Sequence, residues 1–472
     1  MNRRELAYRN NSLLGKIDWV VVFIYITLVT IGIVTIYSTT HNVNIENTSL
    51  VSFSTKYGKQ IAWVGVSAFL GFLIFLIDAT IYQKFAYFIY GFCLILLVVV
   101  LFMPPVNGAR AWLGIGSLGI QPAEFAKIGT ALALTKLIPT LNLRTLDMSS
   151  VLKVNALILI PMILIILQPD AGSLVVFTAF LFVFYREGIS YDPIILKLLN
   201  FFGIHHFKKT WLGNHFIPLL FFVVVVSMLT LLKSGDTITF DDFPGIELPG
   251  MMAIVFFFSG ILLVLLVITF VFFNKKERGR FTLIFIISFL ITIFIVGSVN
   301  SLFHQLKPHQ KERIELFLGL REDPNGDDYN RNRAMAAVGS GGLYGKGFKQ
   351  ASLSSTEANH VPESETDFIF CPLSEEWGFV GSATVIVLFV VLLVRIIQIA
   401  ERQRSAFTRI YAYAVATILF YHFAINVGMD IGLAPVIGIP LPFISYGGSS
   451  MMSFSVMLFV LLKLDSQRLD VF

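Results

Sequence analysis

The sequence IDWVVVFIYITLVTIGIVTIY, residues 17–37, is an apolar run of the length that crosses a lipid bilayer. An α-helix needs about 20 apolar residues to span the hydrocarbon core. The run is longer than the roughly 7–15 residues of a signal-peptide core, and no small-x-small cleavage site follows it. Basic residues precede it: Arg3, Arg4, Arg9 and Lys16. We therefore expect a retained first membrane helix.

The same apolar pattern recurs along the chain. Of the 472 residues, 56% are hydrophobic and 14% are charged. Soluble domains average about 25% charged residues. With the first run, counted as 17–39, the chain has twelve candidate spans. The others are 60–78, 81–103, 122–139, 151–168, 171–186, 214–233, 251–273, 281–303, 377–399, 408–430 and 445–464. The sequence predicts an all-α polytopic membrane protein, with residues 1–472 as a single membrane domain.

The basic residues follow the positive-inside rule, by which Lys and Arg collect on the cytoplasmic side of a membrane. With a cytoplasmic N-terminus, the inner segments hold most of them and the short outer loops hold few. Those in the outer loops are Lys56, Lys59, Arg110 and Lys233. Both termini are therefore predicted inside, and the polar segment 304–376 outside. The net charge of +5 is spread between apolar runs, which argues against nucleic-acid binding.

Segment 304–376 is the one long polar stretch, and we expect chemistry there, at the membrane surface. Asp323 stands in an Asp-Pro-Asn-Gly context, where an Asp is usually a turn residue. Asp327 and Asp328 are rivals for any carboxylate role. A general base must lie within about 3 Å of the proton it removes. The sequence alone therefore leaves the choice among these carboxylates open.

Two further features of this segment have both a binding and a structural interpretation. Arg313 lies four residues after His309, on one face of a short amphipathic helix. That face either attracts an anionic headgroup or is simply solvated. The acidic residues that follow either bind a divalent cation or pair with basic residues of the segment. They are Glu363, Glu365, Asp367, Glu375 and Glu376.

The glycine-rich stretch 339–347 resembles a phosphate loop but is not a Walker A motif. That motif needs Gly at the position of Ser340, and Ser or Thr after Lys346. An ATP-driven pump is therefore not expected. The stretch is either a flexible turn or a set of backbone amides that, with Lys346, contact a pyrophosphate.

Charged residues next to or inside the predicted spans are the other candidates. Glu124 and Lys127 are three residues apart and share one helix face. They either line a polar cavity that grips a headgroup or form an internal salt bridge. Arg110 and Trp112 either hold a phosphate and a sugar face or anchor the loop at the interface.

Three other features are interpreted from their local chemistry. Asp170 either lines a cavity or caps the helix that follows it. Cys93 and Cys371 are predicted to be small buried packing residues without a disulfide, and no zinc spacing exists. Prolines near the C-terminus indicate either non-helical backbone around a cavity or a simple kinked helix end. They are Pro435, Pro440 and Pro442.

Together these motifs resemble the SEDS family (shape, elongation, division and sporulation), and most closely its RodA branch. The matching stretches run in the family's order over almost the whole chain. They are Gly108-Ala-Arg-Ala-Trp-Leu-Gly114, Gln121-Pro-Ala-Glu-Phe-Ala-Lys127, Leu167-Gln-Pro-Asp-Ala-Gly172, His309-Gln-Lys-Glu-Arg-Ile314, Asp323-Pro-Asn-Gly326, Gly339-Ser-Gly-Gly-Leu-Tyr-Gly-Lys-Gly347, Pro362-Glu, Thr366-Asp-Phe-Ile-Phe370, Glu375-Glu-Trp-Gly-Phe379 and Gly438-Ile-Pro-Leu-Pro-Phe-Ile-Ser-Tyr-Gly-Gly-Ser-Ser450.

The resemblance implies an inverting peptidoglycan glycosyltransferase of the bacterial cytoplasmic (inner) membrane. It would polymerise lipid II during cell elongation beside a class B penicillin-binding protein. Its implied architecture is GT-C-like, with about ten core transmembrane helices, so residues 200–279 would be an inserted helical hairpin.

The resemblance also implies roles for individual residues. Asp323 becomes the general base, and Trp112, Glu124 and Lys127 match the family's loop Trp and membrane Glu/Lys pair. The leaving group is a pyrophosphate, so cations are expected to stabilise it. The candidates are Arg110, Lys127, Arg313 and Lys346. No cofactor is certain, and the need for a divalent cation, Mg²⁺ or Mn²⁺, is left open.

The chain departs from the family pattern at Asp328, Arg333, Ala334 and Glu365. These departures bear on metal use and on details of segment 304–376, but not on the matched residues. Two other functional classes stay open: a flippase or transporter of lipid-linked precursors, and a non-catalytic scaffold for a penicillin-binding protein. The partner, the role of the insert and the control of glycan length do not follow from the sequence.

Overall fold

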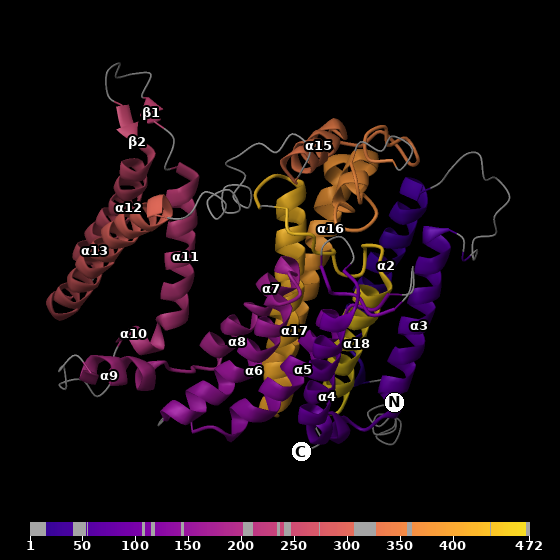
Figure 1. Ribbon diagram of the computed structural model, residues 1–472, viewed down its shortest axis with the longest axis horizontal. Helices are drawn as coiled ribbons and strands as arrows, with labels where there is room; N and C mark the ends of the chain where they lie inside the picture. The colour runs from indigo at the N-terminus through magenta and orange to yellow at the C-terminus, as the bar shows by residue number, and fades with distance from the viewer. Residues whose placement is uncertain are drawn as a thin grey trace, which may run out of the picture. The chain divides into compact units, whose positions relative to one another are not determined.

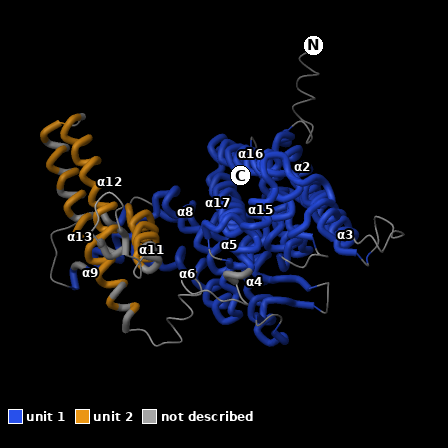
Figure 2. Tube along the Cα trace, turned by 90° about the horizontal axis from the view of Figure 1, so that it is seen from above, with its two compact units in different colours: residues 1–214, 329–472 blue, residues 215–328 orange. Residues whose placement is uncertain are grey.

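The computed structural model describes residues 16–40, 53, 55–105, 109–114, 119–142, 146–201, 211–233, 237–239, 247–272, 274–305, 327–355, 361–434 and 436–468. Within these ranges the chain is almost entirely helical (Figure 1), which confirms the predicted all-α class. The chain divides into two compact units, Met1–Asn214 with Tyr329–Phe472, and His215–Asp328 (Figure 2).

The first unit begins with helices that coincide with the first predicted spans. They are α2 (Trp19–Thr40), α3 (Lys56–Leu76), α4 (Ala79–Val99) with the 3₁₀ turn η2 (Val100–Phe102), α5 (Pro122–Leu137) with η4 (Ile138–Thr140), and α6 (Met148–Ile166). Local side chains define two of the starts. Thr55 accepts a hydrogen bond from the amide of Gly58 at the start of α3, and Asp78 accepts one from Thr80 at the start of α4. Such caps satisfy amides that have no partner inside the helix.

The rest of the first unit consists of short helices followed by long ones. The short ones are α7 (Ala171–Phe177), α8 (Phe180–Arg186), α9 (Asp192–Phe201) and α10 (Trp211–Asn214). After residue 326 come α15 (Asp327–Ser340), α16 (Phe370–Glu401), α17 (Ala406–Asp430) and α18 (Gly448–Ser466). The last helices pack on the first ones: α16 on α2, α18 on α3, and α17 on α5. Figure 1 shows this as yellow and orange helices beside indigo and violet ones.

Ion pairs join these distant parts at the predicted cytoplasmic end. Asp18, just before α2, accepts hydrogen bonds from Arg395 and Arg402 near the end of α16 (3.0–3.1 Å). Arg402 also pairs with Asp465 on α18. The two carboxylates are buried, so each needs such a partner.

Within its described residues, the second unit contains three helices and a small antiparallel sheet. The helices are α11 (Phe216–Lys233), α12 (Gly250–Phe272) and α13 (Lys275–Gln305). The strands are β1 (Thr237–Thr239) and β2 (Glu247–Pro249), with Ile238 opposite Leu248. Its buried apolar cluster consists of Val226 from α11, Ile254 from α12, and Ile295 with Val296 from α13. Residues 200–279 as an insert remain a prediction. The compact unit in the structure, 215–328, also includes α13, which packs on both α11 and α12.

Among the described residues, eight helices are long and apolar enough to cross a membrane. They are α2, α3, α4 extended by η2, α6, α12, α16, α17 and α18. Shorter apolar stretches occur at Ala171–Arg186 and Phe216–Ser227. Each of the twelve predicted spans, including those of α5 and α13, falls on a described helix or pair of helices. The chain is thus a multi-pass membrane protein.

Helix α16 is broken at Gly378, whose backbone angles (φ 65°, ψ −162°) are not helical. The glycine-rich stretch 339–347 supplies the hydrogen bonds that the break requires. The amides of Lys346 and Gly347 donate to the carbonyls of Glu375 and Glu376, and the amides of Phe379 and Val380 donate to those of Gly342 and Leu343 (2.9–3.1 Å). The stretch is therefore a structural clasp on α16. The amides of Lys346 and Gly347 are used in this clasp and are not free to hold a pyrophosphate.

Glycines are needed in this clasp because the two backbones nearly touch. A Cβ on Gly345 would lie 2.0 Å from the carbonyl oxygen of Glu376, and one on Gly341 would lie 2.1 Å from that of Ser374. A Cβ on Gly378 would lie 2.3 Å from the nitrogen of Gly345. Real Cβ atoms do not come this close to other atoms.

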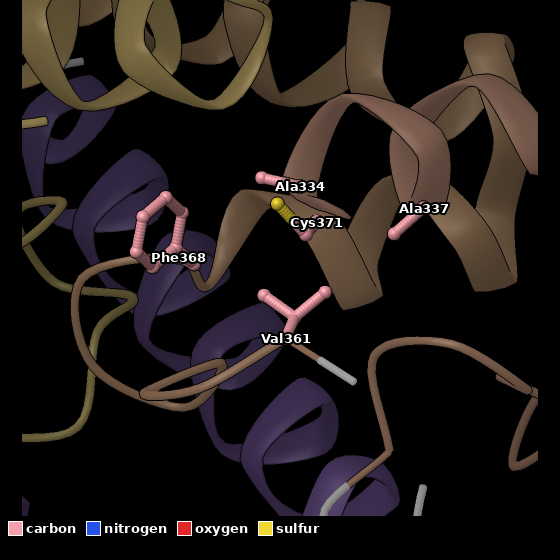
Figure 3. Packing of buried hydrophobic residues seen from close by; sticks show 5 residues of the cluster. All are labelled: Ala334, Ala337, Val361, Phe368 and Cys371. Atoms are coloured by element: carbon pink, nitrogen blue, oxygen red, sulfur yellow. The ribbon is translucent and has the colours of Figure 1, made fainter. Parts of the chain in front are cut away.

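Helix α15 is fixed to the same region by a small apolar cluster. Ala334 and Ala337 on α15 pack with Val361, Phe368 and Cys371 (Figure 3). Cys371 and Cys93 are both buried and free, as predicted. The cluster therefore joins α15 to residues 361–371, which lead into α16.

We expect Gly378→Ala to lower the free energy of unfolding by about 2 kcal/mol or more. The substitution places a side chain in a backbone region that is essentially restricted to glycine, and it separates α16 from the clasp. The matched control is Gly339→Ala, which lies in helical α15 with no atom within 4 Å of its Cβ. Thermal unfolding in detergent measures both, and equal stability of the two variants would refute the clasp.

Candidate active site

The start of α5 places Glu124 and Lys127 deep inside the first unit. Pro122 occupies the first turn, where its fixed φ favours a helix start. The amide of Gln121 donates to Ser449 Oγ (3.0 Å), and Ser453 Oγ donates to the carbonyl of Glu124 (2.7 Å). Helix α18 therefore holds the first turn of α5.

Glu124 and Lys127 form an ion pair, with 2.7 Å between Lys127 Nζ and Glu124 Oε1. Their exposed fractions are 2% and 0%. The predicted shared helix face is thus correct. Nζ is also 2.7 Å from Nε2 of His422 on α17, and 5.2 Å from the centre of the Phe454 ring. Glu124 Oε2 is buried without a hydrogen-bond partner among the described residues.

His422 connects this pair to the non-helical segment between α17 and α18. Its Nδ1 lies 3.1 Å from the carbonyl oxygen of Pro440. One turn later on α17, Asn426 Nδ2 donates to the carbonyls of Asp367 (2.6 Å) and Ile439 (2.7 Å). The segment is therefore non-helical backbone covered by protein side chains, and not a simple kinked helix end.

Asp170 is a helix cap, one of the two roles that its sequence context allows. Its carboxylate accepts from the amide and hydroxyl of Ser173 at the start of α7 (2.9 and 2.8 Å). Gln121 Nε2 donates to the same carboxylate (2.8 Å). Asp170 thereby joins the start of α7 to the start of α5.

Asp367 is a half-buried carboxylate close to Asp170. Its Oδ2 lies beside Gly438, 3.2 Å from where a Cβ on that glycine would be. Burial, reinforced by the charges of Glu363 and Asp170, raises the pKa of Asp367 to about 6. A carboxyl group with such a pKa changes its charge near neutral pH. The sequence placed Asp367 in an acidic tract and in one of the stretches that match the family, but gave it no role of its own.

The loop before α5 has an exposed surface. Arg110 is exposed, and its Nη1 donates to the carbonyl of Leu101 (3.2 Å). Trp112 is 39% exposed. Leu113 and Ile120 exchange backbone hydrogen bonds (2.8 and 2.7 Å), which fold the loop back on itself.

Lys346 is paired within its own loop. Its Nζ lies 2.6 Å from Glu375 Oε1 and 2.8 Å from Ser352 Oγ. Glu375 also accepts hydrogen bonds from the amides of residues 352–354. Its charge is thus satisfied inside the protein, in line with pairing rather than cation binding for this member of the acidic tract.

Other acidic residues of the tract also have partners. Glu365 forms an ion pair with Lys56 at the start of α3, outside the tract's own segment. Glu376 accepts from Ser38 near the end of α2. Among the described residues, no group of three or more His, Cys, Asp or Glu side chains is arranged to hold a metal ion.

Two predicted site residues, Asp323 and Arg313, lie outside the described residues, as does His309. The structure does bring Glu124 and Lys127 together and places Asp367 and Asp170 near each other. His422 and Asn426 were missed by sequence reasoning. Both stand in the predicted span 408–430, and a polar or ionisable side chain within a span is a signal of function.

Comparisons with known proteins identify the family of the chain. The family model described as "Cell cycle protein" (FtsW, RodA, SpoVE) matches residues 18–208 and 206–469. The chain is 30% identical over 460 residues to peptidoglycan glycosyltransferase RodA of Treponema pallidum (strain Nichols), covering 96% of this chain and 98% of the relative. It is 27% identical over 401 residues to peptidoglycan glycosyltransferase MrdB of Escherichia coli (strain K12), covering 83% and 81%.

A solved structure supports the fold. It is described as "Structural coordination of polymerization and crosslinking by a peptidoglycan synthase complex" and aligns with a TM-score of 0.61 at 23% identity, over 96% of this chain and 99% of that chain. The chain therefore belongs to the FtsW, RodA and SpoVE family of cell cycle proteins, the SEDS family that its motifs resemble.

Proposed function

We propose that this chain is a peptidoglycan glycosyltransferase that polymerises lipid II during cell elongation. The observation that carries the proposal is its similarity, over almost its whole length, to a relative named peptidoglycan glycosyltransferase RodA. The buried ion pair of Glu124 and Lys127 supports it, because both residues lie in the motif that the sequence shares with the family.

In the proposed reaction a sugar hydroxyl attacks the anomeric carbon of a lipid-linked sugar and inverts it. The bond between the anomeric carbon and the pyrophosphate oxygen breaks, and the undecaprenyl pyrophosphate leaves with one more negative charge than it carries in the substrate. Asp323 takes the proton of the attacking hydroxyl. Cations aimed at the leaving group lower the barrier because charge develops there in the transition state.

The described cationic side chains differ in how many of their hydrogen-bond donors remain available to a pyrophosphate. Lys127 is buried and has one ammonium N–H without a partner in the described part of the chain. Arg110 is exposed, with one donor used by Leu101. Lys346 already pairs with Glu375, so we assign it mainly to holding the loop. Trp112 offers an exposed ring for a sugar face, and Arg313 completes the proposed set.

We further propose that both termini are cytoplasmic and that segment 304–376 is outside, where lipid II is presented. The distribution of Lys and Arg supports this orientation. A class B penicillin-binding protein is the proposed partner, supported by the likeness to a chain from a peptidoglycan synthase complex. If a divalent cation takes part, pyrophosphate oxygens and one or two carboxylates would bind it, as is usual for Mg²⁺.

A flippase for lipid-linked precursors is the alternative, since a buried ion pair would also suit transport. A transporter needs polar groups along a complete path through the membrane, whereas the candidate residues of this chain fall in two stretches of the sequence, residues 110–127 and segment 304–376. A non-catalytic scaffold is the second alternative. Polymer formation by the purified chain with its partner excludes both as the sole function.

We expect Asp323→Asn to abolish polymerisation of lipid II by the purified protein with its partner, because the attacking hydroxyl loses its base. The matched controls are Asp327→Asn and Asp328→Asn, which remove neighbouring carboxylates of the same segment. Gel analysis of the glycan product measures all three. Full polymer formation by Asp323→Asn, or loss of it only in a control, would overturn the assignment.

We expect Lys127→Met to reduce the polymerisation rate by about 100-fold or more, the usual effect of removing a donor that meets developing charge. The protein should remain in the membrane. The double variant Glu124→Gln with Lys127→Met leaves no unpaired buried charge, and we expect it to be folded and equally inactive.

Lys136→Met on the same helix is the control for Lys127→Met. Lys136 is half-exposed and donates to the carbonyl of Lys84 (2.9 Å), away from the ion pair. We expect it to keep normal activity. Normal polymerisation by the double variant of Glu124 and Lys127 would show that the ion pair has only a structural role.

A further inference from the structure

The hydrogen-bond directions around His422 can be derived from its two neighbours. The carbonyl oxygen of Pro440 can only accept, so Nδ1 of His422, 3.1 Å away, carries a proton and donates. The ammonium of Lys127 can only donate, so Nε2, 2.7 Å from Nζ, accepts. One neutral tautomer of the imidazole satisfies both contacts.

Nε2 of His422 is a second acceptor for Lys127, beside Glu124, and it limits how the ammonium can be oriented. An ammonium with only a carboxylate beside it can turn all its donors towards the two carboxylate oxygens. Here one N–H is bonded to Glu124 Oε1 and a second to His422 Nε2, both at 2.7 Å. Because the three N–H bonds are arranged tetrahedrally, fixing two of them fixes the direction of the third.

The third N–H of Lys127 has no partner within the described ranges, and neither does Glu124 Oε2. Both groups are fully buried, where an unsatisfied polar group is costly. A donor and an acceptor left open side by side are the arrangement expected where a polar ligand group enters.

His422 is itself held rigidly. Its ring packs edge-on against Phe454, with 4.7 Å between the ring centres, and it is fully buried. Asn426, one turn further along α17, donates to the carbonyl next to that of Pro440. The imidazole therefore has little freedom to follow Lys127 if the lysine moves.

We propose that His422 is a positioning residue, which holds the ammonium of Lys127 so that its third N–H is directed at the leaving pyrophosphate. This inference rests on the proposed function. His422 itself does not contact the substrate. It makes Lys127 a preorganised donor and prevents the lysine from turning its charge entirely towards Glu124.

Two amide variants separate the contacts of His422. His422→Gln places an amide oxygen where Nε2 lies and can still accept from Lys127. His422→Asn, with the shorter side chain, reaches only as far as Nδ1 and retains the contact with Pro440. We expect His422→Asn to lower kcat for lipid II polymerisation about 10- to 100-fold, with KM changed less than about threefold, because the donor is misplaced in the transition state. His422→Gln should restore kcat to within about threefold of the wild type.

Tyr411→Phe is the control for loss of a buried hydrogen bond on the same helix. Tyr411 is fully buried on α17 and donates to the carbonyl of Met457 (3.3 Å). We expect it to lower the melting temperature without changing kcat. If the wild type is active but His422→Gln and His422→Asn have equal kcat, the inference about His422 is wrong and the proposed function stands. The same holds if kcat follows the melting temperature in all three variants. A wild type that forms no polymer would overturn the proposed function and this inference together.

Discussion

Lys127 is a fully buried positive charge, and the structure around it provides an opposite charge as its partner. An unpaired ammonium in such a place would be very costly. Helix α5 provides Glu124 three residues earlier, and α17 provides His422 from the other end of the chain. Helix α18 binds the backbone of the same turn through Ser453. The need to pair one lysine thus brings the first and last thirds of the sequence together.

A second desolvated charge organises the predicted outer loop in the same way. Glu375 is enclosed by the amides of residues 352–354 and by Lys346, and the glycine-rich stretch clasps the break in α16 beside it. Glu375 has all its hydrogen bonds, whereas Lys127 and Glu124 each have one to spare. We use that difference to separate groups that hold the fold from groups that we propose meet a substrate, although both kinds are buried and charged.

Local patterns in the sequence predicted the features of the structure that depend on residues close together in the chain. Hydropathy located the spans, the three-residue spacing predicted the contact of Glu124 with Lys127, and Asp170 before a helix predicted a cap. Partners that are far apart in sequence could not be predicted, because hydropathy does not indicate which helices meet. His422 lies 295 residues from Lys127, so its position in an apolar span could mark it as unusual but could not identify its partner.

The glycine-rich stretch illustrates why a motif needs its surroundings before it has a function. By composition it suits a phosphate, since free amides in a row attract anions. In the folded chain the amides of Lys346 and Gly347 are bonded to carbonyls of α16. Gly341 and Gly345 of this stretch are required because its backbone lies so close to that of α16, and not because of a ligand. In the proposed function, positive charge for the pyrophosphate therefore comes mainly from Lys127 and Arg110, which precede segment 304–376 by almost two hundred residues, together with Arg313 of that segment. The segment that we propose to be catalytic and two of the cations that we propose to serve it are thus far apart in the sequence.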